Sequence, residues 1–149
     1  MAKTAKAEEK KEKIVVDISN FFTTTREKEG VWYEIHVDEI ATGLEVKLLG
    51  AASDENVLSA DVYRKEHEEA EKEKDPAKKA ELERKAVCKR LSAIITDLRC
   101  KKGYEIIING EPLTYSPEAV YQILWESKDI RSDIFQATFD DSNFMMKKD

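Results

Sequence analysis

The sequence has few of the residues that build catalytic and metal sites, and it lacks the common catalytic motifs. Its 149 residues include two histidines, two cysteines, three prolines and five glycines. Neither histidine has a partner histidine three or four residues away, and Cys88 and Cys100 are not spaced as a zinc pair. No GxGxxG, P-loop, GxSxG or HExxH motif occurs. These absences make an enzyme the weaker interpretation, and we expect no catalytic, cofactor or metal site.

Long apolar runs and excess positive charge are also missing. No stretch approaches the roughly 20 apolar residues of a membrane span. The opening segment, MAKTAKAEEKKEK, has no apolar core of a secretory signal. A net charge of -6 argues against binding to nucleic acid or to anionic membranes. Two cysteines make no disulfide framework in a chain of this length and fit a reducing cytosol. We therefore expect a soluble, intracellular protein.

The length predicts one domain with a core of its own. Residues 1–13 contain no large apolar side chain except the initial Met1, and they predict a flexible charged tail. Residues 14–149 predict a single α+β domain. Its first apolar anchor is expected in the stretch IVVDISNFF, from Ile14, Val15, Val16, Ile18, Phe21 and Phe22.

The next segment, VWYEIHVDEIATGLEVKLLG, predicts a β-hairpin. Val31, Tyr33, Ile35 and Val37 alternate with polar residues or Trp32, which is the period of a half-buried strand. The same alternation resumes over residues 44–48. The ATG stretch between the two runs is expected to turn the chain.

Two helices are predicted over about 57–74 and 76–98, separated at Asp75-Pro76. The first is long and strongly charged, with both signs interleaved, and is expected to project into solvent. An alternative role for it is an arm for self-assembly, which leaves a homo-oligomer open. The second helix is expected to bury a stripe that consists of Val87, Leu91, Ile94 and Leu98, widened by Ile95.

The last third of the chain predicts a short second hairpin followed by a pair of helices. Asn109-Gly110 is a strong signal for a two-residue hairpin turn. Ser116 is expected to cap a helix with Pro117 at its first position, and a second short helix is expected from about Lys128. The fold class is therefore α+β, with an N-terminal hairpin, two central helices, a short hairpin and a C-terminal helical pair.

Several residues could carry chemistry, and each has a simpler interpretation. A metal site made from His36, Cys88 and Cys100 would depend on tertiary proximity that the spacing does not indicate. Cys88 is expected to be a buried apolar residue and Cys100 an ordinary thiol at a helix end. The adjacent carboxylates Asp38-Glu39 and Asp140-Asp141 are expected at turns and helix ends, because neighbours in sequence rarely face one site.

Aromatic residues make protein binding the better prospect. Aromatic side chains are favoured at protein interfaces, although most are core residues in a domain of this size. Four are predicted to contact a partner. They are Tyr121, Trp125, Phe139 and Phe144, and Phe144 stands out because it follows the last helix in a polar context.

From about Gly30 to Phe144 the chain resembles the tail assembly chaperones of long-tailed bacteriophages. The resemblance rests on the hairpin GVWYEIHVDEIATGLEVKLLG, a Lys/Glu-rich helical middle, and the helix CKRLSAIITDLR. It ends on NGEPLTYSPEAVYQILWESKDIRSDIFQATFDDSNF, which is similar to the family's short G-x-P hairpin, Ser/Thr-Pro-Glu helix, second short helix and terminal Asn-Phe. The chain departs from the pattern at Leu98, where a tryptophan is expected, and the lysine-rich N-terminal tail has no counterpart.

The resemblance implies a role without catalysis. Such proteins bind the long, aggregation-prone tape-measure protein in the host cytoplasm and help recruit the tail-tube protein, which displaces them. Many members also have a frameshifted, longer form, and the terminal MMKKD would suit a slip site. Three alternatives stay open at this point: a structural virion protein of the tail or head–tail region, a small regulatory adaptor, and an enzyme whose pocket gathers His36 and carboxylates.

Overall fold

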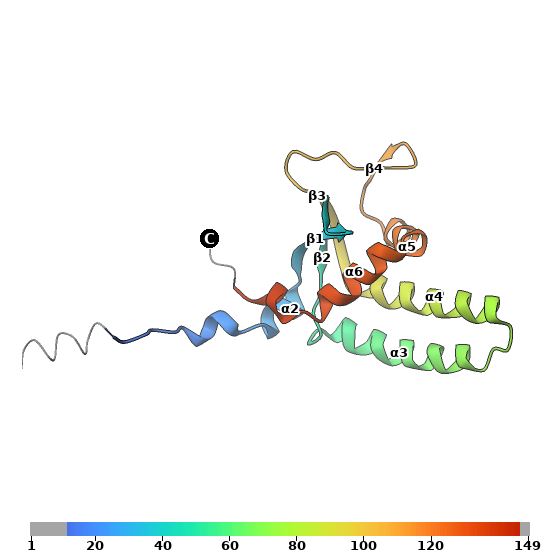
Figure 1. The fold of residues 1–149 in the computed structure, drawn as a ribbon, viewed down its shortest axis with the longest axis horizontal. Coiled ribbons are helices and arrows are strands. Elements are labelled where there is room, and N and C mark those ends of the chain that lie inside the picture. The colour runs from blue at the N-terminus through green and yellow to red at the C-terminus, as the bar shows by residue number, and fades with distance from the viewer. Residues whose placement is uncertain (1–11, 147–149) are drawn as a thin grey trace, which may run out of the picture.

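The computed structural model describes residues 12–146, and it confirms the α+β class. Most of the predicted tail, and the terminal residues of MMKKD from 147 onward, lie outside this range. The first elements of the described part are a short 3-10 helix, Ile18–Phe21, and the helix α2, Thr24–Glu29. The sheet, a long helical hairpin and a C-terminal pair of helices follow (Figure 1).

A three-stranded antiparallel sheet forms one layer of the fold. Its order is β1 (Val31–Val37), β2 (Ile40–Leu48) and β3 (Ile95–Cys100). The predicted first hairpin is confirmed, but its turn is not at ATG. The chain turns at Asp38-Glu39, which both have positive φ, at 51° and 65°. A two-residue turn of this kind matches the twist of the flanking strands, and aspartate, as at position 38, tolerates the left-handed region better than most residues.

Strand β3 corrects the prediction of one helix over residues 76–98. Helix α4, Pro76–Ala93, ends five residues earlier, and Ile94 leaves helical geometry with ψ near 2°. From Ile95 onward the chain pairs with β2, so that Leu98 lies opposite Val46. The spacing of Leu91, Ile94 and Leu98 suits a helix, but Ile95 and Leu98 are also the inward positions of a strand with an irregular start. Residues 95–100 form a strand and not a helical turn because they pair with β2.

Helices α3 (Asp54–Glu71) and α4 form a hairpin that projects from the sheet (Figure 1). Helix α3 begins about three residues before its predicted start because the Ser53 hydroxyl accepts a hydrogen bond from the Asn56 amide and caps the helix. The break at Asp75-Pro76 is confirmed. The Asp75 carboxylate accepts a hydrogen bond from the Ala77 amide, and Pro76 is the first residue of α4.

The second hairpin and the C-terminal helical pair are confirmed, although the hairpin is short. It joins β4 (Ile107–Ile108) to β5 (Glu111–Pro112) through Asn109-Gly110, both with positive φ. Helix α5, Pro117–Glu126, is capped by Ser116 as predicted, and Ser127 caps α6, Lys128–Thr138. A short 3-10 helix, Asp141–Phe144, follows.

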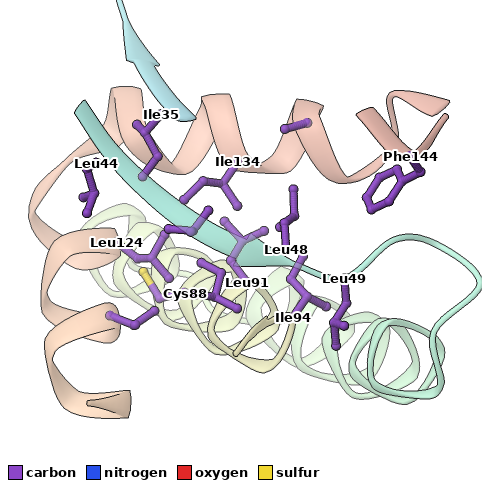
Figure 2. Packing of buried hydrophobic residues seen from close by; sticks show 14 residues of the cluster. Ile35, Leu44, Leu48, Leu49, Cys88, Leu91, Ile94, Leu124, Ile134 and Phe144 are labelled. Carbon is purple, nitrogen blue, oxygen red and sulfur yellow. The ribbon is translucent and has the colours of Figure 1, made fainter. Parts of the chain in front are cut away.

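The core lies between one face of the sheet and helices α4, α5 and α6. Figure 2 shows Leu48, Leu91, Leu124, Ile134 and Phe144 within this cluster. The opposite face of the sheet is polar: Glu45 bonds Arg99 and Glu34 bonds Lys101 there. Within residues 12–146 the fold is thus two-layered, with α4, α5 and α6 packed on one side of the sheet.

A single carboxylate ties α6 to the edge strand β1. The Tyr33 hydroxyl and the His36 backbone amide each donate to one oxygen of Asp133, both at 2.8 Å. Burial, followed by the hydrogen bond to Asp133, raises the pKa of the Tyr33 phenol well above its usual range. Asp133 thereby gives a partner to an edge amide that the sheet leaves free.

The predicted first apolar anchor was wrong. Ile14, Val15 and Val16 are exposed, and Val15 keeps 91% of its surface accessible. The other three members of that set are exposed as well: Ile18, Phe21 and Phe22. Residues 12–22, which we name the arm, extend away from the body of the protein instead of entering its core (Figure 1). The core is filled without the arm.

Candidate protein-binding surfaces

Two of the predicted partner residues lie together on helix α5. Tyr121 and Trp125 are one turn apart, and their rings stack with centroids 6.2 Å apart and planes at 15°. They flank the inner face of α5, where Val120 and Leu124 enter the core. Both rings are therefore half-buried and leave one side open.

Neighbouring elements hold Trp125 in place. Arg131 on α6 donates to the carbonyl oxygens of Leu124 and Trp125, at 2.7 and 2.9 Å, and so caps the end of α5. On the other side, the Arg84 guanidinium of α4 lies 4.9 Å from the centre of the Trp125 ring. This distance is within the range of a cation–π contact. Contacts from α4 and α6 therefore hold Trp125 in position in the absence of a partner.

The two rings form part of a groove between α4 and α5. Its volume is about 650 Å³, and its other lining residues are Glu81, Lys85, Pro117, Glu118 and Gln122. Apolar surface dominates, with charges of both signs around it. Burial is the main cause that raises the pKa of Tyr121 above its usual value. The aromatic groove, as we name it, can receive an apolar stripe with polar flanks.

A second groove lies between α3 and α4, and it was not predicted from the sequence. Leu58 and Val62 form its wall on α3, and the small residues Ala86 and Ala93 line it on α4. Its surface is almost wholly apolar. The spacing of Leu58 and Val62, four residues apart on a charged helix, was the available signal. Their exposure could not be judged without knowing where α4 packs.

Phe139 does not join the aromatic groove. It lies on α6's C-terminal end, in an edge-on contact with Phe135 and with ring centroids 5.4 Å apart. The Arg90 guanidinium lies between these rings and Tyr63, at 5.4 to 5.9 Å from the three centroids. Phe139 is 44% exposed, so it is available to a partner, but on a surface separate from Trp125.

Phe144 corrects the prediction most clearly. It was expected to contact a partner, yet it is fully buried in the core. The cause is the short 3-10 helix after α6. Asp140 accepts from the Ser142 amide and starts that turn, and the Asn143 side chain donates to the Ala137 carbonyl. These bonds direct the ring of Phe144 inward from what looks, in sequence, like a polar tail.

Among the other candidate residues, His36 lines a surface pocket of about 300 Å³ together with Glu34, Glu45 and Lys101. His36 lies on β1, and Asp38-Glu39 and Asp140-Asp141 are turn and cap residues as predicted. His67, Glu71 and Glu83 do place three possible metal ligands within 4.8 Å of one another. Glu71, however, is already paired with both His67 and Lys79 at the surface. The group lies at the surface between α3 and α4, where Glu71 is shared between His67 and Lys79.

Cysteine reactivity gives a first testable prediction. Cys88 is fully buried, and burial raises the pKa of its thiol; Cys100 is half-buried on β3. In the native protein, Ellman's reagent at pH 8 should modify one thiol readily and the second only after denaturant is added. Peptide mapping should assign the first to Cys100. Fast modification of Cys88 in the native state would contradict its position in the core.

Comparisons with protein-family models, with curated proteins and with solved structures gave no match. In the part of the chain that the structure describes, no helix has the length and apolar character needed to cross a membrane.

Proposed function

We propose that the protein is a non-enzymatic tail assembly chaperone. It would bind an apolar helical segment of the tape-measure protein in the host cytoplasm and hand that protein over when tail-tube subunits assemble. The proposal rests on the sequence resemblance together with one structural observation. That observation is the aromatic groove, where a stacked Tyr121–Trp125 pair is held open to solvent between two helices.

The groove suits a helical ligand for a physical reason. An amphipathic helix presents an apolar stripe with polar flanks, and grooves between two helices are a common receptor for it. Tryptophan and tyrosine dominate the binding energy of such interfaces because they are large and lose little conformational freedom. The charges Glu81, Lys85 and Glu118 at the groove's rim can meet the polar flanks of the ligand. Binding of this kind shields an apolar segment without any chemical step.

A binding experiment tests the proposal. The probes are overlapping synthetic peptides that span the tape-measure protein encoded by the same phage. At least one should bind, and Trp125→Ala should weaken that binding by at least tenfold, as expected for a central aromatic anchor. Gln122→Arg should weaken it as well. Gln122 is exposed, and arginine four residues after Glu118 favours the helix, so this variant tests the groove without disturbing the fold.

Trp32→Ala is the matched control. Trp32 is also half-buried and also carries an arginine against its ring, Arg99 at 4.0 Å, but it lies on β1 of the sheet. It should leave peptide binding unchanged. Equal losses in the Trp32 and Trp125 variants, or no binding of any peptide, would contradict the proposal.

The exposed arm favours one alternative, a structural protein of the tail or head–tail region. A contiguous set of exposed apolar residues marks an interaction site, and in an assembled particle a neighbouring subunit would cover it. This second candidate differs from the first in a measurable way, because a structural protein is retained in the mature virion.

A further inference from the structure

Three possible metal ligands come together where α3 packs on α4, toward the end of the helical hairpin that is far from the sheet (Figure 1). His67 and Glu71 are one turn apart on α3, and Glu83 belongs to α4. Their ligand atoms all lie within 4.8 Å of one another. The spacing of histidines and cysteines does not reveal such a set, because its third member comes from a second helix.

One edge of a coordination site is already formed. The His67 Nε2 atom and the Glu71 Oε1 atom lie 3.6 Å apart. This separation is too long for a good hydrogen bond. Two ligand atoms of a tetrahedral Zn²⁺ ion, each about 2.0 to 2.2 Å from the metal, are about 3.4 Å apart. A metal ion bound between Nε2 and Oε1 therefore needs only a small adjustment of the two side chains.

Neighbouring side chains hold both of these ligands. The Tyr63 ring stacks on the His67 imidazole, with centroids 5.9 Å apart and planes at 17°. Lys79 of α4 donates to the other oxygen of Glu71, Oε2, at 3.3 Å. The ion pair with Lys79 therefore leaves Oε1 directed toward His67. Hydrogen bonds of this kind orient metal-binding carboxylates and contribute to metal affinity.

Glu83 supplies the third ligand. Its side chain is half-buried against α3. Two ion pairs join described residues of α3 and α4, Lys79–Glu71 and Lys89–Glu66, and neither uses the Glu83 carboxylate. A half-buried carboxylate close to a second carboxylate is stabilised by a cation that both can share.

The local charge and the ligand types indicate which cation fits. Helices α3 and α4 together have nine acidic and eight basic residues, so the hairpin as a whole is close to neutral. At the site itself, the carboxylates of Glu71 and Glu83 and the ammonium of Lys79 leave one negative charge beside a neutral imidazole. One imidazole nitrogen with two carboxylate oxygens suits a divalent transition-metal ion such as Zn²⁺. Mg²⁺ and Ca²⁺ prefer oxygen ligands alone.

We propose that His67, Glu71 and Glu83 bind one divalent transition-metal ion, which links the last turns of α3 to the first half of α4. Three protein ligands leave a further coordination position to water. None of the three ligands lines the aromatic groove, so the site goes beyond the proposed function and does not depend on it.

Titration of the metal-free, full-length protein with Zn²⁺ by isothermal calorimetry tests the proposal. One equivalent should bind, and it should raise the midpoint of thermal unfolding, because a ligand of the folded state stabilises that state. His67→Gln and Glu83→Gln should each weaken binding by about tenfold or more, since even a group that only orients a metal ligand contributes about this factor. Excess Mg²⁺ should not displace the bound Zn²⁺.

His36→Gln and Glu68→Gln are the matched controls. His36 is the other histidine of the chain, and Glu68 is an exposed carboxylate next to His67 that is not one of the three ligands. Both variants should bind Zn²⁺ as the wild type does. All four substituted side chains are at least partly exposed, so circular dichroism should show native helix content in each variant. A wild type that does not bind Zn²⁺, or binding that survives both His67→Gln and Glu83→Gln, would overturn the proposal.

Discussion

Phe144→Ala should lower the free energy of unfolding by about 3 kcal/mol, at the lower end of the range for replacing a buried phenylalanine by alanine. The ring is fully buried in the core cluster, although it is only five residues from the last residue of the chain. Its removal leaves a cavity between the sheet and the end of α6. Urea denaturation followed by circular dichroism measures the change.

Phe139→Ala provides the comparison, because Phe139 is the same residue type on the same terminal segment. Its ring is 44% exposed and in contact with Phe135, so we expect a loss of about 1 kcal/mol. If the two variants were equally stable, Phe144 would not be a core residue. The prediction from the sequence that Phe144 contacts a partner would then be the better explanation.

Asp133→Ala should lower the free energy of unfolding by about 2 to 3 kcal/mol. The substitution leaves two donors without their acceptor, the Tyr33 hydroxyl and the His36 amide. It also separates α6 from the edge of β1. An alkaline titration of tyrosine absorbance gives a second readout. The pKa of Tyr33 should move toward its ordinary value, because Asp133 is one of the causes that raise it.

Asp133→Asn is the control for that prediction. Asparagine keeps the shape, accepts from the His36 amide and can donate to the Tyr33 oxygen, so about 1 kcal/mol should be lost. A variant with alanine that is as stable as the one with asparagine would show that the two hydrogen bonds contribute nothing.

Short sequence signals predicted the secondary structure correctly where the residue types at one or two positions determine a turn or a helix cap. Asn109-Gly110, Asp75-Pro76 and Ser116-Pro117 each marked its turn or cap correctly. The alternation of Val31, Tyr33, Ile35 and Val37 likewise predicted β1. In each of these cases the local conformation can be predicted without knowledge of the tertiary structure, because a few neighbouring residues determine it.

Signals that depend on tertiary packing were misleading. Residues 94–98 suit a helix or a strand, and only pairing with β2 selects the strand. The arm looked like a core segment because apolar residues usually are, yet the core is filled without it. Phe144, by contrast, looked like a surface residue but is buried, because the turn before it directs the ring into the core.

Part of the aromatic groove could be predicted from the sequence. Tyr121 and Trp125 lie one turn apart on a helix whose inner face is taken by Val120 and Leu124, and this could be read from the sequence. The groove itself could not, because α4 supplies Arg84, Glu81 and Lys85 from some 40 residues earlier in the chain. The α3–α4 groove was missed for the same reason.

The central claim is that this protein assists assembly and then departs. Under the proposed function, quantitative mass spectrometry of purified phage particles, compared with the lysate of infected cells, tests it most directly. We expect the protein to be abundant in the lysate and absent from the particles. A fixed number of copies in each particle would contradict it and would identify a structural protein of the virion.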